Sequence, residues 1–272
     1  MDAKRILFIT QEITPYLPES EIAIIGRNLP QGTQECGREI RTFMPKFGNI
    51  NERRNQLHEV IRLSGMNLII DDTDHPLIIK VASIQSARMQ VYFIDNEDFF
   101  QRKSLVSDVQ GKEYEDNDER SIFYVRGVLE TIKKLRWIPD LIHCHGWMSA
   151  LTALYIKRMY ADDPCLKDAK IVYSVYNDEF NTPFRKEFAD KLKMDGATDE
   201  DVALLKDDTS FISLTKLAID FSDGVIQGSE VVNPEITSYI SGMNGKPFLP
   251  YQSPDDYIDS FNKFYDVILD SN

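Results

Sequence analysis

Apolar residues recur along this chain with two periods, one typical of strands and the other typical of amphipathic helices. Short apolar runs predict strands at residues 5–10, 39–45, 66–70, 77–81, 89–94, 141–142, 170–175 and 224–227. Three-to-four spacing predicts helices at residues 20–29, 53–63, 118–136, 148–159, 184–192, 199–205, 213–221 and 234–240, and from residue 253 onwards. Strands that alternate with helices indicate an α/β fold with a Rossmann-like, doubly wound and mainly parallel sheet. The three consecutive strands between residues 66 and 94 indicate an antiparallel β insertion.

The same pattern predicts one large domain followed by a short tail. Residues 1–245 are expected to form the Rossmann-like domain, and residues 246–272 a linker and a C-terminal helix. The helix has a start signal, because Ser253 can cap it, Pro254 suits its first position and two aspartates favour its positive end. Its apolar face is expected to dock on the domain through Ile258, Phe261, Phe264, Tyr265 and Ile268.

The composition excludes several classes of protein. A formal net charge of -13 over 272 residues argues against a binder of nucleic acid or of anionic membranes. Three cysteines, Cys36, Cys144 and Cys165, show no pairing pattern and indicate a reducing compartment. The first apolar run is too short for a signal peptide, and no run approaches the length of a membrane span. The sequence therefore predicts a soluble, cytoplasmic protein without membrane partners.

The strongest site signal is the strand-to-helix turn at residues 138–157. It places His143, His145 and Trp147 at alternate positions where a strand pattern changes to a helical one. Ligands of doubly wound sheets bind beyond the carboxyl ends of the strands, so these side chains are candidates for a binding site. A structural role for the His-X-His pair, with one ring packed and the other bonded to a carbonyl, explains the pattern equally well. No further Cys or His follows at ligand spacing, so neither a metal nor a cofactor is expected.

Five short motifs occur in the same order as in one known family. They lie at residues 6–15, 43–48, 114–120, 142–147 and 222–229, and they read ILFITQEITP, FMPKFG, YEDNDER, IHCHGW and SDGVIQGS. In this order they resemble the N-terminal domain of bacterial glycogen synthases and plant starch synthases, which use ADP-glucose. The resemblance covers about residues 5–240. It implies the N-terminal half of a GT-B glycosyltransferase, in which chemistry takes place in the cleft between two Rossmann-like halves.

The resemblance also implies a reaction and a set of site residues. The family joins glucose from ADP-glucose to the 4-hydroxyl end of an α-1,4-glucan with retention. His145 and Asp116 match family residues that line the sugar site, where an imidazole and a carboxylate can face the positive charge of the transition state. The implied substrate-binding residues are Asn117, Arg120, His143, Trp147, Tyr176 and Asn177. Capping of the helix near residue 118 by Asp116 and Asn117, and burial of Trp147 in the core, are the structural alternatives.

Four departures from the family pattern bear on activity. Pro18 stands where the family's phosphate-binding loop has its lysine, and Ser20 and Glu21 stand at its paired glycines. Glycine amides and a lysine would attract a diphosphate, whereas Glu21 adds negative charge and bulk. Gly146 replaces the aspartate of the family's His-x-His-Asp-Trp, and Tyr176 replaces the histidine of its Thr-x-His-Asn. A full synthase also continues into a second domain that binds most of the nucleotide, whereas only a linker and one helix follow here.

The sequence is consistent with two functions. The first is a glycogen or starch synthase-like glycosyltransferase domain in glycogen biosynthesis that needs a separate polypeptide for its C-terminal half. The second is a non-catalytic module that binds an α-glucan or maltooligosaccharide, or a protein partner, in the remaining cleft. The altered loop indicates that the chain is not active alone under either hypothesis, since an enzyme of this kind must position its reactants from both walls of the cleft.

Overall fold

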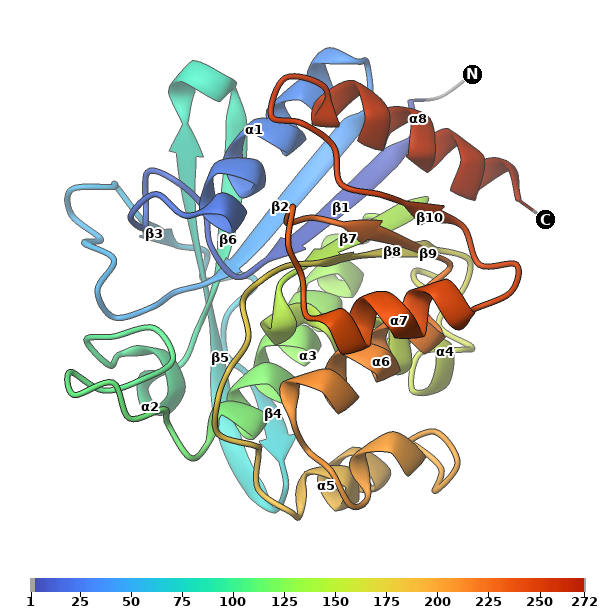
Figure 1. Cartoon of the computed structure of the whole chain (residues 1–272). Coiled ribbons are helices and arrows are strands. Elements are labelled where there is room, and N and C mark those ends of the chain that lie inside the picture. The colour runs from blue at the N-terminus through green and yellow to red at the C-terminus, as the bar shows by residue number, and fades with distance from the viewer. Residues whose placement is uncertain (1–2, 272) are drawn as a thin grey trace.

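The fold is built around one ten-stranded sheet, and a computed structural model describes it for residues 3–271 (Figure 1). The strand order is β10-β9-β8-β7-β1-β2-β6-β5-β3, and β4 pairs with β5 away from this path. Pairing is parallel from β10 to β6 and antiparallel at β5, β3 and β4. The strands are β1 (Arg5–Thr10), β2 (Glu39–Pro45), β3 (His58–Glu59), β4 (Met66–Ile70), β5 (Thr73–Ile84), β6 (Met89–Asp95), β7 (Leu141–His145), β8 (Lys170–Val175), β9 (Gly224–Gln227) and β10 (Phe248–Leu249). This confirms the predicted α/β class with a mainly parallel sheet and an antiparallel insertion.

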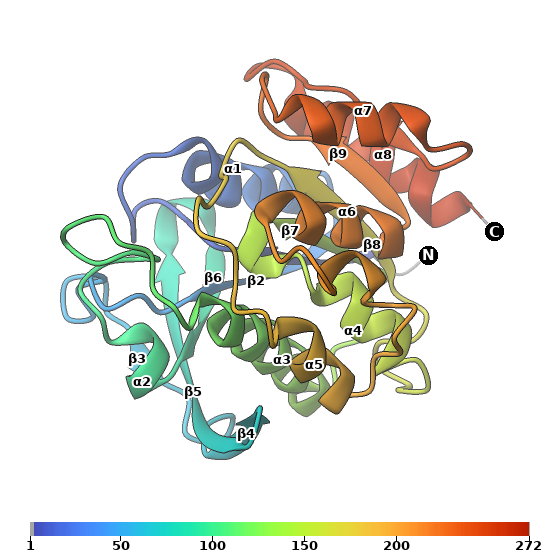
Figure 2. The ribbon, with the colours of Figure 1, turned by 60° about the horizontal axis from the view of Figure 1, so that its bottom comes forward.

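Helices cover both faces of the sheet. Helices α1 and α8 lie on one face, and α3, α4 and α6 lie on the other (Figure 1, Figure 2). The helices are α1 (Glu21–Glu35), α2 (Glu97–Phe100), α3 (Asn117–Leu135), α4 (Thr152–Arg158), α5 (Phe188–Met194), α6 (Phe211–Phe221), α7 (Pro234–Gly242) and α8 (Tyr257–Asp270), and short 3-10 turns occur at Gln85–Ala87, Trp147–Ser149 and Ala203–Leu205. Within residues 3–271, none of these helices combines the length and the apolar character that crossing a bilayer requires.

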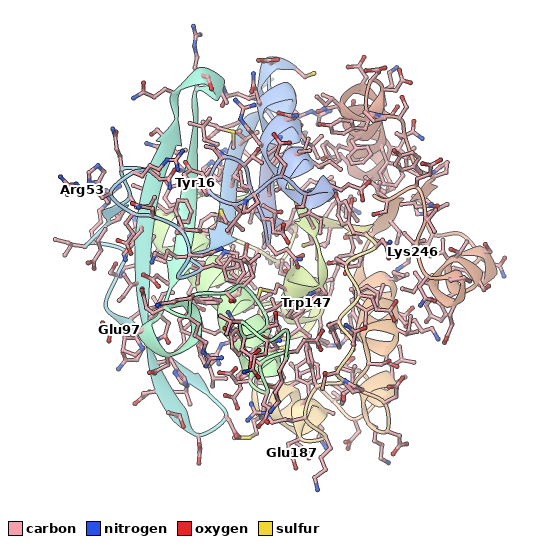
Figure 3. The ribbon with its side chains drawn as sticks, turned by 60° about the vertical axis from the view of Figure 1, so that its left-hand side comes forward. Tyr16, Arg53, Glu97, Trp147, Glu187 and Lys246 are labelled. Carbon is pink, nitrogen blue, oxygen red and sulfur yellow. The ribbon has the colours of Figure 1, made fainter. Side chains whose placement is uncertain are left out.

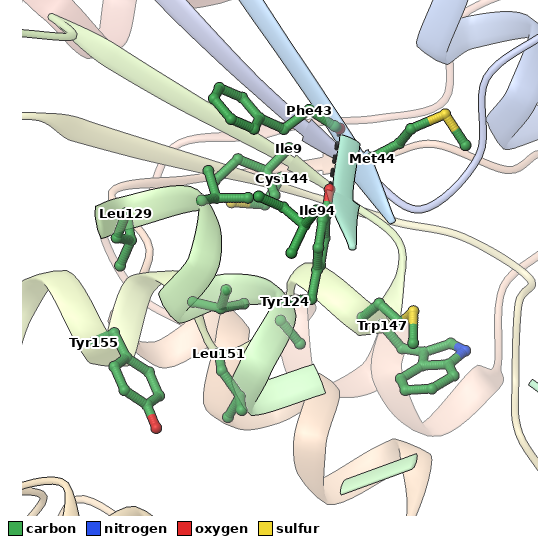
Figure 4. Close-up of a cluster of buried hydrophobic side chains, with 14 of the residues drawn as sticks. Ile9, Phe43, Met44, Ile94, Tyr124, Leu129, Cys144, Trp147, Leu151 and Tyr155 are labelled. Atoms are coloured by element: carbon green, nitrogen blue, oxygen red, sulfur yellow. Dashed lines mark hydrogen bonds between the residues drawn. The ribbon is translucent and has the colours of Figure 1, made fainter. Parts of the chain in front are cut away.

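Two apolar cores lie between the sheet and its helices. The larger core lies against α3, α4 and α6, and Figure 4 shows part of it around Tyr124. The Tyr124 hydroxyl lies 2.7 Å from the carbonyl oxygen of Thr10 and 3.0 Å from that of Phe43, so it joins α3 to β1 and β2. The smaller core lies against α1 and α8 and includes the buried rings of Phe261 and Tyr265. Burial on both faces explains why the central strand β1 contains an unbroken apolar run, Ile6 to Ile9.

The C-terminal helix α8 is held on the sheet and on α1 by close packing and by polar contacts. A Cβ on Gly32 of α1 would lie 2.5 Å from Ile258, so the two helices approach closely where this glycine leaves room. Asn262 donates its side-chain amide to Thr33 Oγ1 at 3.2 Å, and Arg38 donates to the carbonyl of Asn262 at 3.0 Å. The apolar face expected from the sequence is the face that docks.

The segment between α7 and α8 contains more structure than the predicted linker. Strand β10 pairs in parallel with β9 and extends the sheet at this edge. Helix α8 begins at Tyr257 and not at Ser253, where the capping pattern predicts it. The Ser253 carbonyl instead accepts the amides of Asp256 and Tyr257, so this residue closes the turn that precedes the helix.

The predicted helix at residues 53–63 is wrong. This segment forms turns and the short strand β3, which lies at the edge of the sheet and pairs with β5. The Val60 amide donates to the carbonyl of Ile79 at 2.8 Å, so the backbone bonds that a helix would make internally go to the sheet. Gln56 has a φ of 53°, which interrupts any right-handed helix at this point.

Two further predicted helices are only partly correct. Helix α5 begins at Phe188 and not at residue 184, because the Phe184 amide donates to the carbonyl of Thr209. Residues 199–205 contain only a 3-10 turn. Thr198 and Asp201 exchange the two hydrogen bonds of a capping box, although an α-helix does not follow.

Candidate functional site

Several parallel strands end at one edge of the sheet, and the polar residues that follow them are joined by hydrogen bonds. Strands β1, β7, β8 and β9 lead into Glu12, Gly146, Asp178 and Ser229, respectively. Ser229 Oγ accepts the Asn177 amide at 2.9 Å and donates to Glu21 at the start of α1. The Trp147 amide donates to Asp178 Oδ2 at 2.9 Å. These contacts connect the ends of β7, β8 and β9 to the N-terminus of α1, where ligands of doubly wound sheets bind.

Helix α1 begins at this edge, and a helix N-terminus normally offers free backbone amides to an anion. Here Ser20 caps the helix: its Oγ accepts the Ala23 amide at 3.0 Å and donates to Glu12 Oε2 at 2.6 Å. Glu21 occupies the first turn and is bonded to Ser229. The two residues at the positions of the family's paired glycines are therefore engaged by the chain's own groups, and two carboxylates lie beside the helix end.

Asp178 adds a third carboxylate to this edge, and its side chain is only partly exposed. Burial, and to a lesser extent the neighbouring charges of Glu12 and Glu21, raise the pKa of Asp178 to about 7. The hydrogen bond from the Trp147 amide favours the ionised form but does not offset these effects. Above pH 7 the edge carries a concentrated negative potential, which disfavours a phosphate-bearing ligand.

Replacing Asp178 with asparagine should stabilise the protein at pH 8 by about 2 kcal/mol, a value already reduced because the side chain is partly exposed. The pKa of Asp178 is raised in the folded state, so its ionisation lowers stability as the pH rises from about 4 through 7. Asparagine keeps an oxygen that can accept the Trp147 amide. Urea unfolding at pH 4 and pH 8 measures the difference in the free energy of unfolding between the variant and the unmodified chain. This difference should vanish at pH 4. The exposed Asp162→Asn variant is the control, and equal gains in both variants would contradict the prediction.

The two histidines of β7 lie in the core beneath helix α8. His143 bonds the Tyr265 hydroxyl at 2.6 Å through Nδ1 and the Ser174 hydroxyl at 2.7 Å through Nε2. His145 bonds the Tyr176 hydroxyl at 2.7 Å, and its ring centroid lies 3.8 Å from that of His143. Both rings are buried, and His145 Nε2 has no hydrogen-bond partner among residues 3–271. Burial lowers the pKa of both, to about 3 for His145, so both rings are neutral.

This hydrogen-bonded network supports a structural role for the His-X-His pair, although the ring partners are hydroxyl groups and not the predicted carbonyl. It ties β7 to strand β8 through Ser174, to the residue after β8 through Tyr176, and to α8 through Tyr265. His145 is 1% exposed, so it can reach a sugar only if the residues around it move. A catalytic role for His145 therefore stays a prediction.

Asp116 lies elsewhere, on the loop before helix α3. Arg102 binds both of its carboxylate oxygens, with Nη1 2.6 Å from Oδ1. Burial alone would raise the pKa of Asp116, but the hydrogen bonds and charge of Arg102 lower it, so Asp116 is ionised at neutral pH. Asp116 lines an open pocket of about 390 Å³ together with Lys112 and Arg185, and His145 is not among the residues that line it. The catalytic role predicted for Asp116 also stays a prediction.

The predicted binding residues Asn117 and Arg120 shape the loop before α3. Arg120 is buried and donates to the carbonyl of Phe99 at 2.8 Å, to Asn117 Oδ1 at 2.7 Å and to the carbonyl of Leu105 at 2.7 Å. Asn117 donates its side-chain amide to the carbonyl of Val106 at 2.9 Å. These bonds fix the loop from within. The capping alternative is wrong for Asp116, whose side chain makes no capping bond to α3 within the described residues.

The remaining predicted binding residues differ in their exposure. Trp147, which is labelled in Figure 3, packs against Phe180 and Phe184 with ring centroids 5.2 Å and 5.6 Å apart. It is 2% exposed, which fits the core alternative. Tyr176 is also buried, whereas Asn177 is exposed at the end of β8. Asn177 is therefore the member of this group that a ligand at the strand ends reaches most directly.

Sequence reasoning did not single out the carboxylates and the hydroxyl that dominate this edge. Glu12, Asp178 and Ser229 are all within the first few polar residues after a predicted strand. That position is the signal that could have found them, because the carboxyl ends of neighbouring parallel strands meet at one edge.

Comparison with solved structures defines the class of the fold. The chain resembles the catalytic domain of starch synthase IV from Arabidopsis thaliana, solved bound to ADP and acarbose, with a TM-score of 0.74 and 19% sequence identity. The match covers 94% of this chain and 53% of that chain. At this identity the likeness establishes the fold alone, which is one Rossmann-like half of the GT-B glycosyltransferase type.

Sequence comparison then gives the particular family. The starch synthase catalytic domain family matches residues 5–249, and the chain belongs to it. The glycogen synthase of Chlorobium limicola is 39% identical over 174 residues, which are 64% of this chain and 36% of that protein. The glycogen synthase of Chlorobaculum tepidum is also 39% identical over the same shares. The aligned region thus spans about a third of the length of these curated relatives.

Proposed function

We propose that this chain is a glycosyltransferase-type domain of α-1,4-glucan metabolism that does not transfer glucose from ADP-glucose by itself. The observation that supports this proposal most directly is the group of three carboxylates, Glu12, Glu21 and Asp178, at the strand ends. A diphosphate binds at a helix N-terminus through free amides and positive charge, and these carboxylates oppose both. In this domain the protein's own side chains already bond at the N-terminus of α1, where a diphosphate would bind.

The residues that remain accessible support binding of an α-glucan or a maltooligosaccharide. Asn177 is exposed beside the strand ends, and the carboxylate of Asp116 lines an open pocket. Carboxylates and amides are suitable partners for sugar hydroxyls. The same accessibility favours a second candidate, in which this chain is one half of a transferase and a separate polypeptide supplies the nucleotide-binding half. We also propose a cytoplasmic location, since Cys36, Cys144 and Cys165 are all free thiols.

A glucosyltransferase assay on the purified chain tests the proposal. With ADP-glucose and glycogen, no transfer above the protein-free blank is expected. Calorimetry with ADP should give no binding, whereas maltotetraose should bind. Glucose transfer by the chain alone would contradict the proposal, and transfer only after a second polypeptide is added would favour the second candidate.

Replacing Glu21 with lysine should create a measurable affinity for ADP, strengthening binding by about tenfold or more. The substitution changes the charge in the first turn of α1 by two units and releases Ser229. Calorimetry at low salt measures the effect, which should weaken as salt screens the charges. The matched control is Glu35→Lys at the far end of the same helix. Equal affinity in both variants would mean that net charge and not position is responsible.

A further inference from the structure

A second pocket lies between helix α1 and the segment that leads into α8. It has a volume of about 390 Å³, within the range of roughly 300–1,000 Å³ that is usual for small-molecule sites. Its lining includes Glu21 and Ile24 from α1 and Tyr251, Tyr257 and Phe261 from the C-terminal segment. The C-terminal residues lie beyond residue 249, where the match to the family ends. This pocket is therefore built largely from residues outside the part that the chain shares with its family.

Aromatic and aliphatic side chains form most of the wall of this pocket. The rings of Tyr257 and Phe261 meet edge to face with centroids 5.7 Å apart, and Tyr251 adds a third ring. Ile24 is 40% exposed, so an apolar surface is left open to solvent beside these rings. Tyr257 and Phe261 are 8% and 1% exposed, so the half-buried ring of Tyr251 presents the most accessible π face of this wall. Such a wall suits either an apolar body or a positive charge held against the rings.

The polar chemistry of the pocket selects between these ligands. Glu21 is the only charged residue among those that line it, and no basic residue lines it. Glu21 Oε2 is bonded to Ser229, and within residues 3–271 no donor bonds Oε1. Glu12 and Asp178 lie close enough to add to the negative potential. An anion is repelled here, and a purely apolar ligand would cover Glu21 without compensating its charge.

We infer that this pocket binds a small organic ammonium ion with an apolar body. The ammonium group would pair with the free oxygen of Glu21 and lie near the faces of the aromatic rings. The apolar body would cover Ile24 and the remaining ring surface. The inference goes beyond the proposed function. It is tested by binding of an ammonium ion and not by glucose transfer, so either the inference or the proposed function can fail while the other holds.

Calorimetry at pH 7 with phenethylammonium as the probe tests the inference. The neutral analogue 2-phenylethanol has nearly the same apolar body, and we expect the ammonium ion to bind at least about tenfold more tightly. Equal binding of the two compounds, or no binding of phenethylammonium up to its solubility limit, would overturn the inference. Maltotetraose is the third probe. If it competed with phenethylammonium, the pocket would be a sugar site and the inference would be wrong.

Two pairs of variants place the binding in this pocket. Glu21→Gln should weaken phenethylammonium binding by about tenfold to a hundredfold, while Glu35→Gln at the other end of α1 should not change it. Tyr251→Leu keeps an apolar side chain but removes a π face, and it should weaken binding by about two- to fivefold. Phe248→Leu is its control, since Phe248 is exposed but does not line the pocket. Unchanged affinity in both Glu21→Gln and Tyr251→Leu would overturn the assignment.

Discussion

Lowering the pH from 7 to 5 is expected to reduce the free energy of unfolding by about 4 kcal/mol in the Asp178→Asn variant and by about 3 kcal/mol in the unmodified chain. The loss comes from His143 and His145, whose pKa values are lowered by burial and which are neutral in the folded protein. In the unfolded chain each histidine binds a proton below about pH 6.5, which favours unfolding as the pH falls. Below about pH 6.5, each histidine therefore lowers the free energy of unfolding by about 1.4 kcal/mol per pH unit, until the pH reaches the pKa of that histidine in the folded protein. For His145 that pKa is about 3.

Asp178 acts in the opposite direction, which is why its variant shows the larger loss. Its pKa is raised in the folded state, so the folded protein gains a proton between about pH 7 and pH 4 and is stabilised by acid. Asparagine removes this contribution and leaves that of the histidines. Carboxylates whose pKa is lowered, such as Asp116, lose their contribution only below about pH 4 and do not affect this window.

Urea unfolding at pH 7, 6 and 5 measures how the free energy of unfolding changes with pH. In the Asp178→Asn background, His145→Gln should remove about half of the loss, because one of the two buried rings no longer titrates. The exposed His58→Gln variant should leave the loss unchanged. A free energy of unfolding that stays constant between pH 7 and pH 5 in Asp178→Asn would contradict the neutral, buried state of the pair.

Strand positions could be predicted from the sequence because burial on both faces leaves unbroken apolar runs. Strands β1, β8 and β9 begin and end where the pattern places them. The helix predicted at residues 53–63 is wrong because helical spacing can occur by chance in a segment that forms a short edge strand. The partner of this segment is β5, which lies beyond β4 in the chain. Local spacing contains no information about such a partner.

The site was harder to predict, because the residues that meet there lie far apart in the sequence. Glu12 and Asp178 share one edge since β8, β7 and β1 are neighbours, and apolar periodicity does not specify that order. The sequence pattern placed both histidines in the turn after a strand at residues 141–142, whereas both belong to strand β7. Their partners Tyr265 and Tyr176 come from α8 and from the end of β8, so their role depends on tertiary packing. A motif locates such side chains along the chain but does not determine what surrounds them.

Replacing Gly146 with aspartate, the residue of the related family motif, is expected to destabilise the protein by about 3 kcal/mol or more. Gly146 has a φ of 82° and a ψ of 163°, a backbone conformation that is essentially restricted to glycine. A Cβ at this position would also lie 2.5 Å from the side-chain oxygen of Gln11, which accepts the Met148 amide at 3.3 Å. An aspartate would therefore strain the backbone and displace Gln11 from its hydrogen bond.

Gly37→Asp is the matched control for this prediction. Gly37 has a φ of 86°, and nothing lies within 4 Å of an added Cβ, so its variant should lose only about 1–2 kcal/mol from backbone strain. Combining Gln11→Ala with Gly146→Asp should recover the part of the loss that comes from the clash. Urea denaturation measures these free energies, and equal losses at the two glycines would contradict the prediction. The expected result means that the turn after β7 is built around glycine and Gln11 together. A single reversion would then not restore the family's site, because an aspartate at position 146 needs a different backbone path as well as a smaller neighbour.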